Sequence, residues 1–438
     1  MRFLLLLGVV YMDIKNTDVL EKLLFPTTNL IAKNSYSRDC PEISDEEWIK
    51  LGILRVLSNE TSGRGFLEDL FFGKKAHVST GHFFEMLKSN RRYKFTKELN
   101  EMLVKDDVAL AECNDPLDGI CKELDGFDIY SGDGHHHKAP VHEDKIDSTA
   151  YSTQHFYALN MRTQMVSHID NAEYGDTRKK EHDMRMLKRQ TIDSLRQGAP
   201  KGRKVLLVWD KAGIDYLQWY CWKMSGGIYF LSVEKDNSTA KVLKNIAFDK
   251  SDERNKGIMS NEMVDPSKAE ALRRITYQCP ETGKIFVFLT NLPHSIPPGV
   301  IAYLYKCRWN LEKIYNTFKH KFFENRAWAK SPTAKSIQAN FICLTYNLSI
   351  ILSRKAETES KAGDVQLNKQ HYERKQKRID DLVIKAKKNN RSVSSLLLRV
   401  TALTELPKKF YRWLRRNVVH ETSWTEAFAA LCLSYAEK

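Results

Sequence analysis

Residues 204–210 read Lys204-Val-Leu-Leu-Val-Trp-Asp210 and carry the clearest strand signal in the chain. A run that is apolar on both faces is typical of a strand buried in the middle of a sheet. The run ends on an aspartate, which is followed by Lys-Ala-Gly. We therefore predict a central strand with Asp210 at its carboxyl end.

Upstream of this strand the sequence predicts further sheet elements. Residues 126–133, Gly-Phe-Asp-Ile-Tyr-Ser-Gly-Asp, indicate a short strand that ends at Asp133. Residues 152–170 indicate a hairpin with a polar turn near Asn160–Gln164. A helix then follows from a cap at Asp176 to Gly198. The order strand, hairpin, helix, strand is an α/β pattern.

Downstream, residues 226–292 are β-rich, and the chain is expected to be helical from Pro298 to its end. The polar residues 361–393 indicate either a solvated helix or a mobile arm. The strands expected in the β-rich stretch are Ile228–Val233, Arg273–Gln278 and Lys284–Thr290, and the last two form a hairpin.

The N-terminal third is predicted to be helical. Ser44-Asp-Glu-Glu47 is a capping-box pattern that opens one helix, and Phe66–Phe71 mark a second. Phe83–Leu87 mark a third helix that ends in the basic segment Lys88–Tyr93. A small helical domain with a basic end could bind DNA, and a plain helical cap on the next domain is the alternative.

Charge favours a polyanionic partner such as DNA. The chain has 438 residues, 42% of them hydrophobic, and a formal net charge of +14. Residues 351–438 contain 19 Lys and Arg against 10 Asp and Glu, so most of the excess lies in one fifth of the chain. A basic protein with no role on nucleic acid would have the same balance.

The N-terminal residues and the cysteines give information on the cellular compartment of the protein. Residues 1–11 form a short apolar run with no small-residue cleavage site after it, and Met12 is an alternative start. No other stretch is expected to reach transmembrane length. None of the eight cysteines forms a C-x-x-C pair, so we expect reduced thiols of a cytosolic protein.

Residues 303–325 read Tyr-Leu-Tyr-Lys-Cys-Arg-Trp-Asn-Leu-Glu-Lys-Ile-Tyr-Asn-Thr-Phe-Lys-His-Lys-Phe-Phe-Glu-Asn. On one helix, Tyr305, Arg308, Glu312 and Lys319 fall within an arc of about 60°. A separate apolar stripe contains Leu304, Cys307, Leu311, Ile314, Phe318 and Phe322. Helical geometry alone is equally compatible with a salt-bridged surface helix.

The spacing Tyr305-x2-Arg308-x3-Glu312-x6-Lys319 resembles the Y-R-E-K signature of bacterial insertion-sequence transposases of the DDE superfamily, the insertion-sequence-four-like group. The resemblance covers roughly residues 125–350. It implies that Asp133, Asp210 and Glu312 are the catalytic and metal-binding carboxylates. It also implies that Tyr305, Arg308 and Lys319 hold phosphates of the DNA end.

Phosphodiester transfer explains why such a trio is needed. Two metal ions about 3.5–4 Å apart clamp the attacking and leaving oxygens. Hard carboxylate oxygens suit Mg²⁺ or Mn²⁺. Asp128, Asp144 and Asp147 compete with Asp133 for the first position. Asp133 is preferred because the flanking glycines suit close approach of a metal or phosphate, and because the resemblance selects it.

A histidine-rich segment offers a second kind of site. His135, His136 and His137 precede His142 and Glu143, and H-x-H followed by H-E could bind zinc. A loop of histidines beside a basic DNA channel is the alternative.

Together these observations predict an α/β protein with an RNase-H-like catalytic domain at 121–224 and 298–350, interrupted by a β-rich insertion at 225–297. A helical, possibly DNA-binding, domain at 12–120 precedes it, and a basic helical region at 351–438 follows. The resemblance implies a cytoplasmic, nucleoid-associated bacterial enzyme. We expect the protein to bind element ends and target DNA as a homodimer. Its expected cofactors are two Mg²⁺ or Mn²⁺ ions. The alternatives are an inactive transposase-derived DNA-binding protein and a histidine-based metallohydrolase.

Overall fold

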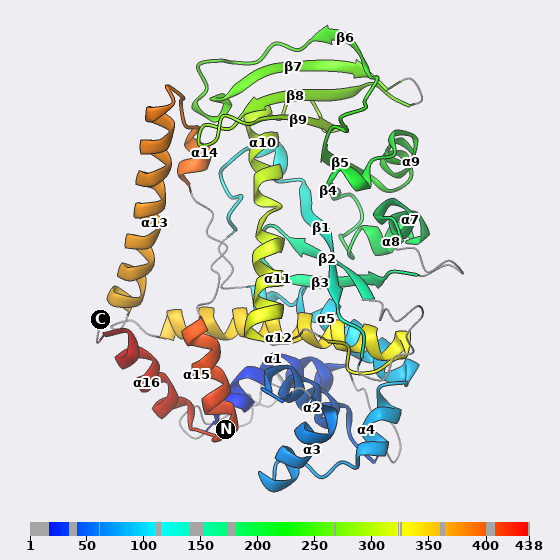
Figure 1. Ribbon diagram of the computed structural model, residues 1–438, viewed down its shortest axis with the longest axis vertical. Coiled ribbons are helices and arrows are strands. Elements are labelled where there is room, and N and C mark those ends of the chain that lie inside the picture. Colours follow the sequence, from blue (N-terminus) through cyan, green and yellow to red (C-terminus); the bar gives the residue numbers. More distant parts are fainter. Residues whose placement is uncertain are drawn as a thin grey trace, which may run out of the picture.

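The computed structural model describes residues 17–34, 42–60, 62–110, 115–140, 153–173, 181–266, 269–322, 324, 326–359, 364–399 and 408–436. Within these residues, a nine-stranded sheet has the order β3-β2-β1-β4-β5-β9-β8-β7-β6 (Figure 1). Its strands are β1 (Phe127–His137), β2 (Thr153–Asn160), β3 (Val166–Asn171), β4 (Lys204–Val208), β5 (Ile228–Val233), β6 (Lys241–Asn245), β7 (Ile258–Asp265), β8 (Leu272–Gln278) and β9 (Ile285–Thr290).

The centre of the sheet is parallel. Strand β4 pairs in parallel with β1 on one side and with β5 on the other. Val205–Val208 are buried on both faces, which confirms the prediction of a central strand. The predicted hairpin is also present, because β2 pairs antiparallel with both β1 and β3.

The β-rich stretch extends the same sheet. The predicted hairpin of β8 and β9 is confirmed, and β7 and β6 continue it as an antiparallel meander. Strand β5, expected within the β-rich stretch, instead joins the two halves, since it is parallel to β4 and antiparallel to β9. The outermost strand, β6, is exposed along its whole length.

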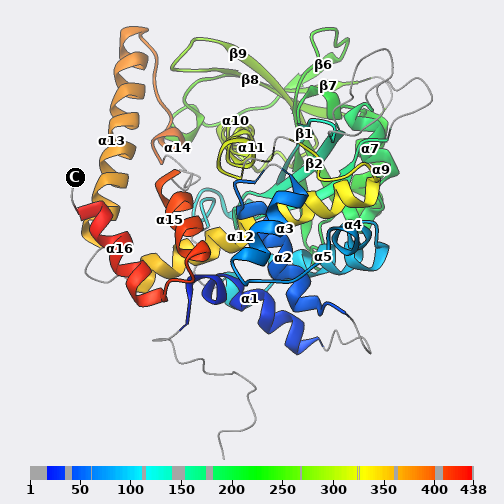
Figure 2. The same cartoon turned by 60° about the horizontal axis from the view of Figure 1, so that its bottom comes forward.

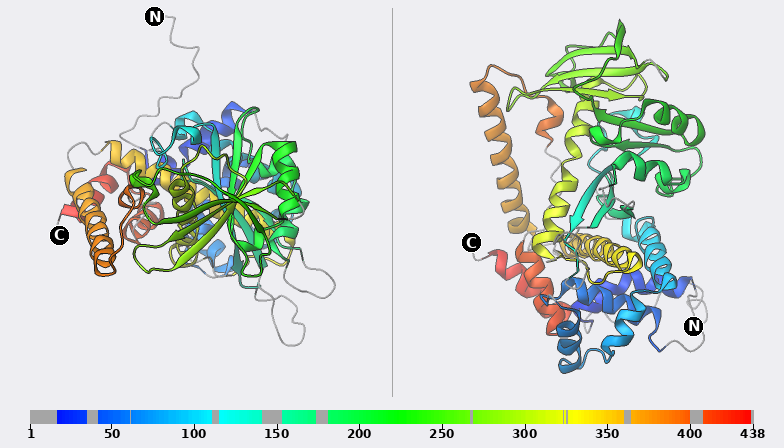
Figure 3. Two further views of the ribbon diagram at one scale, coloured as in Figure 1. Left: turned by 90° about the horizontal axis from the view of Figure 1, so that it is seen from above. Right: turned by 45° about the vertical axis from the view of Figure 1, so that its right-hand side comes forward.

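Helices cover both faces of the central strands (Figure 3). Helix α10 (Pro298–Cys307) packs on one face, and α9 (Tyr216–Gly226) packs on the other. The single helix predicted up to Gly198 is wrong. Two short helices occupy its described part, α7 (Asp183–Arg189) and α8 (Ile192–Leu195). The extended Thr191 between them caps α8, because its hydroxyl accepts from the Ser194 amide.

The N-terminal helices form a layer beneath the sheet (Figure 2). The capping box of Ser44 and Glu47 is present as predicted. The third predicted helix does not end in a basic tail, because Ser89 caps a new helix there. The helices are α1 (Val19–Lys33), α2 (Asp45–Leu57), α3 (Gly63–Phe72), α4 (Thr80–Met86), α5 (Asn90–Leu103) and α6 (Asp107–Leu110).

Helix α12 (Pro332–Glu359) joins this layer to the sheet. The side-chain amide of Asn347 accepts from the Val166 amide and donates to its carbonyl, each at 2.9 Å. Both bonds occupy the free edge of β3, which would otherwise expose unpaired backbone groups. Contrary to the sequence expectation, Pro332–Ala356 is long and apolar enough to cross a membrane, but 94% of its apolar window is buried as a core helix would be.

The C-terminal region is helical, as predicted. Helix α13 stands beside the sheet, and the described side chains along it are mostly exposed, so of the two alternatives it is a solvated helix (Figure 1).

Among the described residues five cysteines are free thiols, and three of these are buried. The remaining helices are α11 (Asn310–Lys321), α13 (Asp364–Lys388), α14 (Ser395–Leu398), α15 (Lys408–Val419) and α16 (Trp424–Ala436).

Close packing between β1 and the residue after β4 yields a test of the fold. A Cβ added at Gly132 would lie 1.8 Å from the Trp209 ring, whereas one at Gly126 would meet nothing within 4 Å. We expect Gly132→Ala to lower the free energy of unfolding by about 1–3 kcal/mol. Gly126→Ala should be close to neutral, and urea unfolding of the two variants checks the difference. Equal stabilities would show that Trp209 does not pack against β1 in this way.

Candidate functional site

Asp133 and Asp210 follow the same register position on two parallel strands. The last pair between β1 and β4 is Ser131 with Val208, and each aspartate comes two residues later. Neighbouring strands lie about 4.8 Å apart, so the two aspartates stand side by side just beyond the point where the pairing of β1 and β4 ends. Asp210 caps the short 3₁₀ helix η2 (Lys211–Gly213) by accepting from the Ala212 amide at 2.8 Å.

Asp133 is held from three sides. Its Oδ2 accepts from Nη1 of Arg308 at 2.7 Å, and its Oδ1 accepts from the Gly134 amide at 2.8 Å. Its backbone carbonyl accepts from the hydroxyl of Tyr315 at 2.9 Å. Arg308 and Tyr315 come from the helical segment after Pro298, so that segment is fastened to β1 at Asp133. The prediction that the strand ends at Asp133 is wrong, because β1 continues to His137 in antiparallel pairing with β2.

The helix predicted over 303–325 is interrupted. Helix α10 ends at Cys307 and α11 begins at Asn310, with a turn at Arg308 and Trp309 between them. The two helices follow one another along the sheet (Figure 1). The surface-helix alternative is also wrong for Arg308, because that residue is buried and pairs with β1.

The four signature residues divide between the two helices. Tyr305 is buried on α10, and the Arg308 guanidinium carbon lies 5.5 Å from the centre of its ring. Glu312 and Lys319 are exposed on α11. Among the described residues Glu312 makes no hydrogen bond or ion pair, so its carboxylate is available to a ligand.

The electrostatics link the three predicted carboxylates. Burial raises the pKa of Asp133 to about 6, although Arg308 and the Gly134 amide oppose the rise. The negative charges of Asp210 and Glu312 raise it further. Asp210 and Glu312 thus each lie within electrostatic range of Asp133, and a bound cation would offset their repulsion of its charge.

The donor set fits a hard divalent cation in its chemistry, since three carboxylates offer only oxygen ligands. The described residues nevertheless contain no group of three or more His, Cys, Asp or Glu that could hold a metal ion as they stand. Both oxygens of Asp133 accept hydrogen bonds from the protein.

The competing aspartates are also located in part. Asp128 lies five residues before Asp133 on β1 and is paired with Arg203 at 2.8 Å. Asp144 and Asp147 lie outside the described residues. The flanking glycines have a different cause from the one expected, because Gly132 makes room for Trp209 and Gly134 makes room for the Gln154 amide.

The comparison with known families bears on this end of the sheet. Residues 131–348 match the family model of the transposase DDE domain. The match supports a DDE transposase, and it includes Asp133, Asp210 and Glu312. No curated protein matches the chain.

Within this DDE-domain region, the histidine run is part of a strand and not of a loop. Because side chains alternate along β1, His135 and His137 are buried, whereas His136 lies on the other face. His135 and His137 lie in one cluster with His155 of β2 and His168 of β3. Nδ1 of His155 lies 3.4 Å from Nε2 of His168. The other two residues of the zinc hypothesis, His142 and Glu143, lie outside the described residues.

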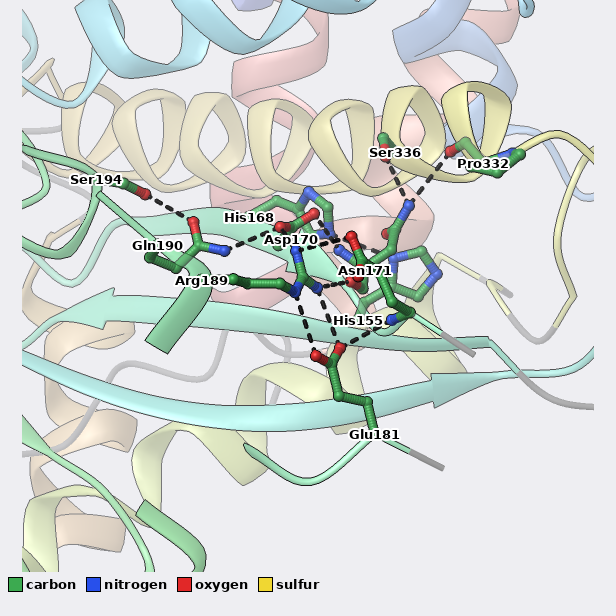
Figure 4. Close-up of polar contacts among 11 residues, drawn as sticks. His155, His168, Asp170, Asn171, Glu181, Arg189, Gln190, Ser194, Pro332 and Ser336 are labelled. Atoms are coloured by element: carbon green, nitrogen blue, oxygen red, sulfur yellow. Dashed lines mark hydrogen bonds and ion pairs between the residues drawn. The ribbon is translucent and has the colours of Figure 1, made fainter. Parts of the chain in front are cut away.

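A charged network beside these histidines ties β3 to its neighbours (Figure 4). Arg189 of α7 pairs with Asp170 of β3 and with the buried carboxylate of Glu181. Asn171 donates to the hydroxyl of Ser336 on α12 at 2.6 Å. These contacts have the geometry of a structural clamp at the sheet edge.

Two contacts near the site were not anticipated from the sequence. Tyr315 lies three residues after Glu312, one helical turn on, and its hydroxyl reaches the Asp133 carbonyl. Its ring stacks on His135 at 4.4 Å between centroids. Trp309 is 58% exposed beside Arg308. The helical period would have found Tyr315, but the exposure of Trp309 depends on the turn between the helices.

The Tyr315 hydroxyl yields a prediction on stability. Tyr315→Phe keeps the stack on His135 and removes the hydroxyl's hydrogen bond to the Asp133 carbonyl, which also lies in the β1–β2 ladder, so we expect a loss of about 0.5–1.5 kcal/mol. The matched control is Tyr157→Phe, because the Tyr157 hydroxyl is buried in the same cluster without a partner among the described residues. That control should be neutral or stabilising, and denaturant unfolding compares the two. Equal losses would contradict the anchoring role of Tyr315.

The buried histidines yield a prediction on pH. Burial lowers the pKa of His137 to about 3, of His168 to about 4, and of His155 well below its usual value. These rings stay neutral when folded but bind protons once unfolded below about pH 6.5. Stability should therefore be full above that pH and fall toward pH 4, by up to about 1.4 kcal/mol per pH unit for each ring.

Unfolding midpoints measured at several pH values test this, with His137→Phe as the variant and exposed His320→Gln as the control. The variant should have a shallower loss on acidification, and the control should match the parent protein. Raised carboxyl pKa values, such as that of Asp133, act in the opposite direction and reduce the net slope. An unchanged slope in His137→Phe would contradict a buried neutral ring.

Proposed function

We propose that this protein is a transposase that cleaves DNA at the ends of a mobile element and joins the freed ends to a target. The observation that carries the proposal is the pair of aspartates level on two parallel strands, with the free carboxylate of Glu312 in electrostatic range. The transposase DDE domain match spans all three residues.

The family uses divalent metal ions, and we assign their ligands to Asp133, Asp210 and Glu312, for two Mg²⁺ or Mn²⁺ ions. When bound, such ions lower the pKa of an attacking water and stabilise charge on the leaving oxygen. The residues themselves set the geometry. Asp133 and Asp210 are fixed by the sheet, and Glu312 approaches from α11, which Tyr315 fastens to the same strand.

Phosphate positioning falls to the remaining signature residues. Arg308 is a planar, permanently charged donor, the kind of group that binds phosphate in two-pronged fashion. The ring of Tyr305 packs against the guanidinium of Arg308. The exposed Lys319 supplies a second positive charge from α11. We assign contacts with the DNA end to these three residues.

The sheet order supports an RNase-H-like arrangement for 121–224 and 298–350. Its first five strands form a mixed sheet with helices on both faces, and β6–β9 extend one side. We propose the insertion-sequence-four-like group from the complete Tyr305, Arg308, Glu312 and Lys319 spacing. The basic region 351–438 supports DNA as the partner, and we propose a homodimer on element ends in the bacterial cytoplasm near the nucleoid.

The alternatives are less well supported. A DNA-binding protein without catalysis has no need for an exposed Glu312 that makes no ion pair among the described residues and lies within electrostatic range of Asp133. A histidine-based hydrolase needs accessible ligands, but His135 and His137 are buried within β1.

Glu312→Gln tests the proposed chemistry. Because the amide removes a metal ligand but no phosphate contact, we expect single-turnover cleavage with Mg²⁺ to fall at least about a hundredfold. Binding of the element end should change little. Exposed Glu68→Gln on α3 is the matched control and should cleave normally. Full cleavage by Glu312→Gln, with melting temperature unchanged, would refute the mechanism.

A further inference from the structure

Each oxygen of the Asp133 carboxylate accepts a hydrogen bond from the protein itself. The Gly134 amide binds Oδ1, and Nη1 of Arg308 binds Oδ2 at 2.7 Å. The Arg308 side chain is 9% exposed and that of Asp133 is 17% exposed, so the ion pair is largely shielded from water. Shielded pairs are screened little by salt. A cation that bound Oδ2 would share this oxygen with the guanidinium and lie close to its positive charge, so the ion pair disfavours metal binding.

Arg308 itself is only partly satisfied. Its Nε–H is buried and has no hydrogen-bond partner among the described residues. Its guanidinium carbon lies 5.5 Å from the ring centre of Tyr305 and 5.8 Å from that of Trp309. Leaving a buried N–H donor without an acceptor costs free energy, so the guanidinium favours a further anionic partner to which it can donate.

We propose that Arg308 is a latch that keeps Asp133 from binding metal until a DNA phosphate draws the guanidinium away. This inference rests on the proposed function. In the closed arrangement the charges of Arg308 and Asp133 cancel. Once a phosphate takes the guanidinium, Asp133 is left as a buried anion facing Asp210 and Glu312. Such an anion needs a cation, so DNA binding promotes metal binding at the same centre.

Linkage makes the two binding events mutual. If DNA raises the metal affinity by some factor, metal raises the DNA affinity by the same factor. Couplings between sites commonly lie at about 5–150-fold. The free protein should therefore bind metal weakly, which limits cleavage of DNA that does not reach Arg308.

The test measures Mn²⁺ binding to the full-length protein by the electron paramagnetic resonance signal of free Mn²⁺. A pH of about 8 keeps a carboxyl with a pKa of about 6 ionised. Without DNA, Arg308→Ala should bind Mn²⁺ at least about fivefold more tightly than the parent protein. Arg308→Gln should do the same, and it serves where the alanine variant does not fold.

Two controls separate the latch from general effects. Lys306→Ala removes the positive charge of an exposed residue two positions before Arg308, and Arg203→Ala breaks the ion pair with Asp128 on the same strand as Asp133. Both should leave the Mn²⁺ affinity close to that of the parent. An increase in Lys306→Ala equal to that in Arg308→Ala would overturn the latch, because loss of positive charge alone would then explain the result.

A second arm adds a duplex oligonucleotide copied from the DNA that flanks the gene. The duplex should tighten Mn²⁺ binding by the parent protein but have little further effect on Arg308→Ala. Equal Mn²⁺ affinity in the parent and Arg308→Ala, with binding still lost in Glu312→Gln, overturns the latch and leaves the metal site intact. Mn²⁺ binding that does not depend on Glu312 in any variant overturns both the latch and the proposed function.

Discussion

A carboxylate removed from water within a strand must face a donor, and at Asp133 that donor is Arg308. This ion pair constrains the positions of α10 and α11 relative to β1. Arg308 can reach the carboxylate only if the chain turns between α10 and α11 above β1. The Tyr315 hydroxyl then binds the backbone of the same residue, so α11 is held at two points. Glu312 lies between these two points and is carried to the edge where Asp210 ends its strand.

The elements that the sequence predicted well have signals that are complete within a few residues. The apolar run of β4 needs no partner to be recognised, and the capping box of Ser44 and Glu47 closes on itself. Helix breaks were harder to predict. Ser89 and Thr191 each cap a new helix where the apolar period continues across them. The turn at Arg308 depends on a partner far away in the sequence, so no local pattern contains it.

The candidate site was predictable in its residue types but not in its contacts. The Y-R-E-K spacing selected Glu312 and Arg308, yet it did not reveal that Arg308 pairs with Asp133. The glycines beside Asp133 were correctly noticed and wrongly explained, since Trp209 and Gln154 fill the space they leave. The histidine run gives no strand signal, because three identical polar residues show no alternation in the sequence, and only the burial along β1 reveals which rings point inward.

Burial shifts the pKa values of the histidines and of Asp133 in opposite directions. The apolar interior that lowers the pKa of His137 to about 3 also contributes the burial that raises the pKa of Asp133 to about 6. Bases there stay uncharged and supply no counter-charge to the acids. The positive charge that stabilises Asp133 must then come from Arg308 or from a cation that enters the site. Because a cation bound to Asp133 would be repelled by the guanidinium beside it, the two compete, and in the proposed latch whatever draws the arginine away promotes metal binding.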